Sequence, residues 1–122
     1  MGDENGSSDL EQRAVLDLLE LQAASAALRR CLEENEAATA ILLEGLGDGE
    51  PLTTIFERIR SSEMRPLVTD ALTRFERIRH RGRLRLVAVA TQQGMSVEEI
   101  QKRWAITRSL AIRSLRQAEK LV

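Results

Sequence analysis

Apolar and small residues recur along the N-terminal third of the chain with the period of an α-helix. From Asp9, which can act as an N-cap, to about Glu34 they follow each other at spacings of three and four, at Ala14, Leu18, Leu21, Ser25, Leu28 and Leu32. The pattern predicts one helix, with an apolar face too broad for an isolated helix in water. We therefore expect residues 9–34 to pack on another element.

The middle of the chain reads as shorter helices separated by breaks. Asn35 can cap a second helix near 36–46, which the glycine-rich stretch 45–49 ends, so that 9–34 and 36–46 form a hairpin. Pro51 suits the first turn of a helix over 51–60 that buries four apolar side chains, Leu52, Ile55, Phe56 and Ile59. After a break at two serines, a helix over 64–80 should bury Val68, Ala71, Leu72, Phe75 and Ile78, and residues 80–82 predict a further break. Residues 83–93 are apolar almost all round, which predicts a buried helix.

The last thirty residues carry two helix starts at short spacing. Gly94 ends the buried helix, and Ser96, followed three residues later by Glu99, has the spacing of a capping box for a helix over 97–104. A tight turn at residues 105–106 leads to Thr107, a second N-cap, and a final helix over 108–120. Helix, short turn and helix, with a third helix in front, is the arrangement that places one helix in a DNA major groove.

Composition agrees with an all-helical fold. The 122 residues include three aromatics (Phe56, Phe75 and Trp104) and two prolines, and Ala, Leu, Glu and Arg are abundant. We expect a disordered tail over 1–8, an acidic helical dimerisation or partner region over 9–50, connecting helices over 51–82 and a helix-turn-helix over 83–122. The fold class is then all-α: an N-terminal helical hairpin followed by a C-terminal tri-helical helix-turn-helix.

The net charge of −1 hides an uneven distribution. Residues 1–50 hold 12 acidic and 3 basic residues, whereas residues 51–122 hold 7 acidic and 15 basic ones. Such asymmetry suggests that the basic half meets a polyanion. The alternative is that the two halves neutralise each other within the chain or in a dimer.

The last third of the chain resembles the helix-turn-helix family of bacterial DNA-binding regulators. The resemblance is carried by Gly94, Ser96, Glu99, Ile100, Trp104, Ile106, Thr107, Arg108, Arg113 and Leu115. Gln101 stands where the family usually has a small Ala, and Ala105 where it usually has a Gly with positive φ. The resemblance implies a wingless, homodimeric, sequence-specific transcriptional regulator that binds double-stranded DNA.

The same resemblance assigns roles to individual side chains. The residues expected to read bases from the final helix are Arg108, Ser109, Ile112, Arg113 and Arg116, because Arg can bond guanine and Ile can touch a thymine methyl. The residues expected at phosphates are Ser96, Thr107, Arg81, Arg83 and Arg85, the arginines alternatively pairing with acidic residues of the N-terminal half. The Leu- and Ala-rich pattern of residues 9–34, rather than the resemblance, indicates a dimerisation element, and its expected contact residues are Leu18, Leu21, Leu28 and Leu32.

Other functions find little support in the sequence. One cysteine, Cys31, and one histidine, His80, build neither a disulfide framework nor a Cys/His zinc site, so we expect no enzyme, metal or cofactor. No apolar run reaches the about 18 residues that cross a bilayer, and the polar start lacks a signal sequence, so we expect a cytoplasmic protein. The alternative function is a protein-interaction adaptor, binding for example RNA polymerase, with a degenerate helix-turn-helix. A small ligand between the helices of the N-terminal half stays open.

Overall fold

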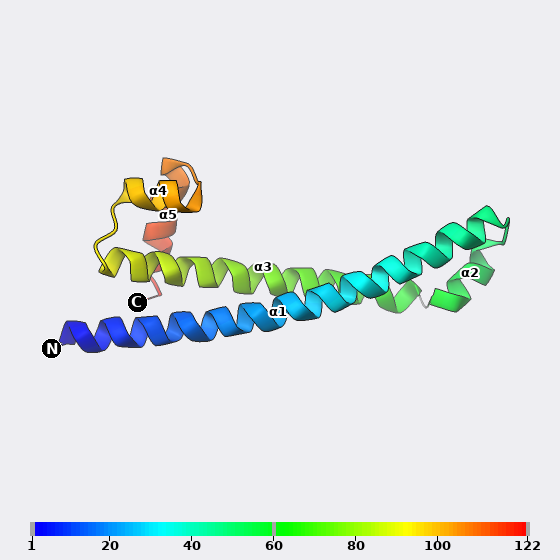
Figure 1. Ribbon diagram of the computed structural model, residues 1–122, viewed down its shortest axis with the longest axis horizontal. Helices are drawn as coiled ribbons and strands as arrows, with labels where there is room; N and C mark the ends of the chain where they lie inside the picture. Colours follow the sequence, from blue (N-terminus) through cyan, green and yellow to red (C-terminus); the bar gives the residue numbers. More distant parts are fainter. Residues whose placement is uncertain (1, 60, 122) are drawn as a thin grey trace. The chain divides into compact units, whose positions relative to one another are not determined.

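The computed structural model describes residues 2–59 and 61–121, with side chains described for 9–59 and 65–121. The described residues form α-helices joined by short connections and include no strand, which confirms the all-α class (Figure 1). The helices are α1 (Gly2–Gly47), α2 (Leu52–Ile59), α3 (Ser61–Gln92), α4 (Val97–Trp104) and α5 (Arg108–Glu119).

The N-terminal hairpin predicted from the sequence does not form. One continuous helix, α1, runs through Asn35, and it begins at Gly2 rather than after Asp9. The carbonyl of Asn35 accepts a hydrogen bond from Thr39 Oγ1 at 2.8 Å inside the helix, and the Asn35 side chain is exposed. An Asn within a helix costs a few tenths of a kcal/mol, which packing of the helix outweighs. The sequence predicts disorder for residues 1–8. Met1 lies outside the described residues, and the side chains of residues 2–8 are not described.

The break predicted at residues 80–82 is also absent. Helix α3 is continuous from Ser61 to Gln92, so the predicted helices 64–80 and 83–93 are one element that passes through Gly82. The predicted ends near the glycine-rich stretch and at Gly94 are confirmed, with positive φ at Gly49 (76°) and at Gly94 (89°). The predicted bounds of α2, α4 and α5 agree with the structure to within a residue or two.

The chain divides into two compact units. The first, called here the terminal unit, comprises residues 1–21 and 77–122, and the second, the middle unit, comprises residues 22–76. The terminal unit therefore contains the start of α1, the C-terminal part of α3, and both α4 and α5.

The core of the terminal unit draws on four helices. Its fully or nearly buried members are Leu10, Val87, Ala88, Ile100, Ala111 and Ala118. Ile100 and Ala111 are fully inaccessible, and Trp104 packs against the same cluster. Within the segment 83–93, which the sequence predicts to be buried, Leu84, Val87, Ala88 and Ala90 are at most 7% exposed, whereas residues 91–93 are exposed. Leu10 brings the start of α1 into this core, which the sequence did not indicate.

The middle unit is held by a close approach of α2 to α1. A Cβ on Gly45 would lie 2.7 Å from side-chain atoms of Ile55, which is fully buried. Because only a glycine leaves room for Ile55, Gly45 sets the contact between the two helices. Ile59 is also buried, but Leu52 and Phe56 are 48% and 42% exposed, so the prediction that they are buried is wrong. Helix α2 therefore buries one face and leaves apolar side chains on the other.

The inner face of α1 differs from the predicted one. Within the terminal unit, Leu10, Ala14 and Asp17 are buried, whereas Leu18 is 40% exposed. In the middle unit, Leu28 is half-buried and Leu32 is 41% exposed. The buried positions of α1 therefore include Leu10, several alanines and Asp17, whereas two leucines of the predicted apolar face, Leu18 and Leu32, are exposed. No helix among the described residues is long and apolar enough to cross a membrane.

Candidate nucleic-acid interface

Helix α4 begins with the cap that the sequence predicts. Ser96 has extended backbone angles, and its Oγ accepts a hydrogen bond from the backbone N–H of Glu99 at 3.2 Å. The Ser96 hydroxyl also donates to the Glu99 carboxylate at 3.4 Å. The cap satisfies one of the free N–H groups at the helix start and fixes where α4 leaves the connection from α3.

The turn between α4 and α5 depends on a strained alanine. Ala105 adopts a left-handed conformation, with φ 52° and ψ 46°, and its N–H bonds to the carbonyl of Gln101. The Ile106 N–H donates to the same carbonyl at 3.1 Å. The position that the family usually fills with glycine therefore has the expected positive φ. An alanine there costs about 1–2 kcal/mol, which the surrounding core must outweigh.

Helix α5 starts at the predicted Thr107 cap. The Thr107 Oγ1 accepts from the Leu110 N–H at 3.2 Å, and Ala111, Ser114 and Ala118 face the core. The Ser114 hydroxyl is buried without a hydrogen-bond partner, and sequence reasoning missed this residue. Its spacing of three and four from Ala111 and Ala118 was the available signal. Leu115 packs against the core.

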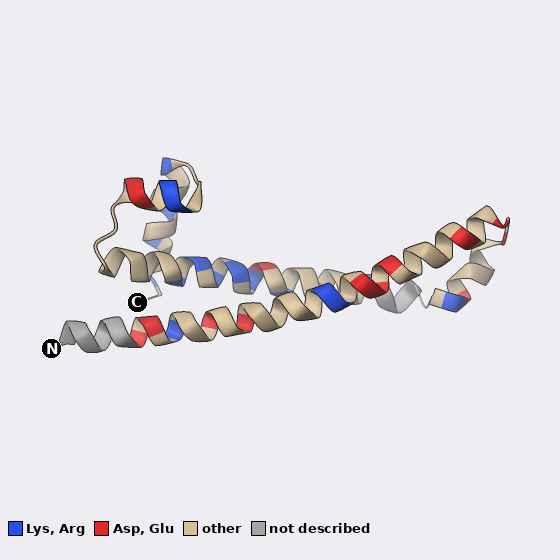
Figure 2. Cartoon of the chain, viewed as in Figure 1, with Lys and Arg blue, Asp and Glu red and all other residues tan. Residues whose placement is uncertain are grey.

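The opposite face of α5 carries the predicted base-reading residues. Ser109, Arg113 and Arg116 are exposed and Ile112 is half-buried, and their positions at i, i+3, i+4 and i+7 place them on one side of the helix. The structure therefore brings these four residues together on a surface that the terminal unit does not cover. Figure 2 shows basic residues along α4 and α5.

Arg108, at the start of α5, already has an acidic partner. Its Nη1 lies 3.2 Å from Glu98 Oε1, and both side chains are more than half exposed. The pKa of the Glu98 carboxyl is lowered, first by a hydrogen bond from its own backbone N–H and then by the Arg108 guanidinium. An exposed pair of this kind contributes little to stability and can exchange for another anion.

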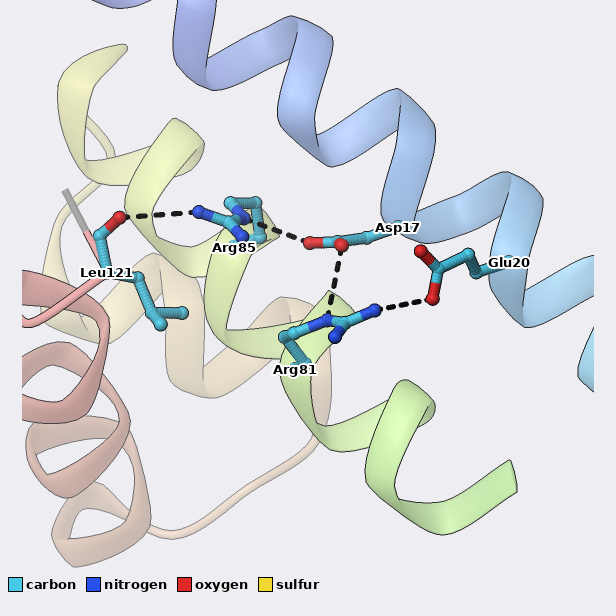
Figure 3. Close-up of polar contacts among 5 residues, drawn as sticks. All are labelled: Asp17, Glu20, Arg81, Arg85 and Leu121. Atoms are coloured by element: carbon cyan, nitrogen blue, oxygen red, sulfur yellow. Dashed lines mark hydrogen bonds and ion pairs between the residues drawn. The ribbon is translucent and has the colours of Figure 1, made fainter. Parts of the chain in front are cut away.

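Two of the predicted phosphate contacts are engaged within the chain. Asp17, 8% exposed at its side chain, accepts a hydrogen bond from Arg85 Nε at 2.9 Å and lies 3.2 Å from Arg81 Nε. Arg81 also donates to Glu20 at 2.6 Å, and Arg85 donates to the carbonyl of Leu121 at 3.3 Å (Figure 3). The sequence left this pairing open as the alternative to phosphate binding. Arg83, the third of these arginines, is half-buried and contacts His80 Nδ1 at 3.0 Å.

The two units carry net charges of opposite sign. The terminal unit holds 12 basic and 9 acidic residues, a net of +3, and the middle unit holds 6 basic and 10 acidic residues, a net of −4. The acidic start of α1 therefore neutralises part of the basic half. The exposed Arg and Lys side chains of the terminal unit include Arg13 on α1 and Arg77 and Arg79 on α3. Those on α4, on α5 and just after it are, besides Arg108, Lys102, Arg103, Arg113, Arg116 and Lys120.

The predicted dimerisation residues differ in exposure and are divided between the two units. Leu21 and Leu28 are half-buried, whereas Leu18 and Leu32 are about 40% exposed. Leu18 and Leu21 belong to the terminal unit and the other two to the middle unit. Comparison with known protein families, with curated proteins and with solved structures finds no match to this chain.

Proposed function

We propose that the chain is a homodimeric, sequence-specific DNA-binding transcriptional regulator that places α5 in the major groove. The observation that carries this proposal is the outer face of α5, where exposed Arg113 and Arg116 lie on the same side of the helix as the half-buried Ile112. Two arginines and an aliphatic side chain supply the contacts that distinguish guanine and thymine in the groove.

The surroundings of α5 suit a duplex. Ser96 and Thr107, the caps of α4 and α5, are exposed, and the free backbone N–H groups of these helix starts can donate hydrogen bonds to phosphate oxygens. Lys102 and Arg103 on α4 are exposed and can meet the neighbouring backbone. Arg108 joins the base contacts once a nucleic acid replaces Glu98 as its partner.

The proposal is tested by selecting bound sequences from a random duplex library with the full chain. Wild type should enrich one motif. Arg113→Ala should relax the preference at one or two positions, because a bidentate arginine supplies about 1–3 kcal/mol of discrimination. Arg30→Ala removes the same charge from an exposed site of the middle unit and should keep the motif. No enrichment by the folded wild type, or an equal effect of both variants, would overturn the proposal.

A protein-interaction adaptor is the second candidate function. It is favoured by four exposed apolar side chains near the end of α1 and on α2, Leu43, Leu46, Leu52 and Phe56, each at least 42% exposed. Exposed apolar side chains on a unit with a net charge of −4 suit a basic, amphipathic partner helix. This function predicts that the selection enriches no DNA sequence.

A further inference from the structure

A carboxylate lies beside one of the proposed base-reading arginines. Glu98, in the first turn of α4, contacts Arg108, the first residue of α5, with 3.2 Å between Glu98 Oε1 and Arg108 Nη1. The two side chains are 71% and 61% exposed, so neither is fixed by burial. A carboxylate at such a position repels phosphate groups, and its place beside a DNA-binding arginine therefore calls for an explanation.

Glu98 is held as an anion by two kinds of donor. The pKa of its carboxyl is lowered first by a hydrogen bond from its own backbone N–H and then by the Arg108 guanidinium. A free N–H at a helix start and an arginine are also the donors that bind phosphate groups in other proteins. The Glu98 carboxylate therefore occupies donors that a nucleic acid would use.

We infer that Glu98 competes with DNA for Arg108 and thereby lowers the affinity of the chain for any duplex. This inference rests on the proposed function and adds an internal restraint to it. Arg108 must leave Glu98 before it contacts a duplex, so part of the gain from the new contact is lost. An exposed ion pair shifts an equilibrium by up to about fivefold, which sets the size of the effect.

Two other roles for Glu98 predict different behaviour. A glutamate that accepts a hydrogen bond from cytosine N4 reads a base, and its loss would weaken the preference for one motif. A glutamate that only stabilises the start of α5 acts equally in the free and the bound chain, so its loss would leave the affinity unchanged. Competition predicts that the affinity rises, that the preference is kept, and that both effects require Arg108.

Fluorescence anisotropy titrations of the full chain measure the competition on two duplexes, one with the selected motif and one scrambled. Glu98→Gln should raise the association constant for both duplexes by about two- to fivefold. Glu33→Gln removes the same charge from an exposed site of the middle unit and should leave both constants unchanged. Both variants alter exposed side chains and should keep the circular dichroism of wild type.

A double-mutant cycle with Arg108→Gln tests whether the effect passes through Arg108. In the Arg108→Gln background, Glu98→Gln should change the association constants no more than Glu33→Gln does, because no arginine is left to compete for. An equal gain in both backgrounds, or no gain while wild type selects a motif, would overturn this inference alone. A lost motif preference in Glu98→Gln would also overturn it, because Glu98 would then read a base. If wild type and Glu98→Gln bind neither duplex, the proposed function fails and this inference fails with it.

Discussion

Neutralising Asp17 should lower the free energy of unfolding of the terminal unit far more than neutralising Glu20. Asp17→Asn keeps the size of the side chain and removes its charge. The Arg85 guanidinium then stays at a site where its side chain is 14% exposed, without the carboxylate that lies 2.9 Å away in wild type. Removing one member of a buried ion pair costs about 3–5 kcal/mol, and we expect about 3 because an asparagine oxygen still accepts a hydrogen bond.

Glu20→Gln is the matched control. Glu20 binds Arg81 at 2.6 Å, a shorter contact than either of those of Asp17, but its side chain is 54% exposed and that of Arg81 is 39% exposed. Exposed pairs contribute about 0–1 kcal/mol because water screens them. Burial rather than distance should therefore decide which variant is destabilised.

Urea unfolding followed by tryptophan fluorescence measures the difference. Trp104 is the single tryptophan, and it packs against the core of the terminal unit, so its emission reports this unit. The free energy of unfolding should fall by about 3 kcal/mol in Asp17→Asn and by less than about 1 kcal/mol in Glu20→Gln. A loss below about 1 kcal/mol in Asp17→Asn would refute the reasoning.

Three further predictions concern the turn, the middle unit and an exposed ion pair. Ala105→Gly should raise the free energy of unfolding by about 0.5–1 kcal/mol in the same fluorescence assay, since strain relief exceeds the entropic cost of glycine; a loss would argue against the left-handed turn. Gly45→Ala should lower thermal stability by about 1 kcal/mol, because its Cβ would meet a buried isoleucine at 2.7 Å, whereas Gly47→Ala, with open space around it, should be neutral or stabilising in calorimetry. NMR titration should place the pKa of Glu98 below its ordinary value, and Arg108→Gln should raise it; the stabilisation that this pair gives is present above the unfolded pKa and is lost as the pH falls through the folded one. An unchanged Glu98 pKa in Arg108→Gln would contradict the pair.

The elements of the candidate interface were predictable because their signals are local. Ser96 and Thr107 mark the starts of α4 and α5 through hydrogen bonds that reach only three residues along the chain. The positive φ at the turn was visible from its place in the pattern, although an alanine stands there. Caps and turns are specified by nearby residues, so one sequence suffices to find them.

The long helices were not predictable from local signals. Glycine at position 82 costs about 1 kcal/mol in a helix interior, and the sequence therefore predicts a break. The helix continues because residues on both sides of Gly82 are held, Ile78 and Leu84 by burial and Arg81 by its ion pairs. These contacts join segments more than sixty residues apart, and no local pattern reveals them.

The same reason explains why the arginines were assigned incompletely. A row of arginines at helical spacing looks alike whether it faces a phosphate or a carboxylate. Arg85 faces a carboxylate, because Asp17 is buried beside it. The sequence alone does not show that this aspartate of α1 faces inward. For the arginines of α5, the sequence predicts no acidic segment as an alternative partner. Four of the five α5 residues assigned to base reading share one face of the helix.

The salt dependence of DNA binding tests whether α5 is a DNA-reading helix. The full chain is titrated into a fluorescent duplex that carries the selected motif, at salt concentrations from about 50 to 200 mM. If α5 reads DNA, the logarithm of the association constant should fall linearly with the logarithm of the salt concentration, with a slope of about −0.9 for each phosphate neutralised. Arg113→Ala should lose the preference for the motif over a scrambled duplex. A folded chain that binds neither duplex at about 50 mM salt, or that binds with no dependence on salt, would contradict the assignment of α5 as a DNA-reading helix.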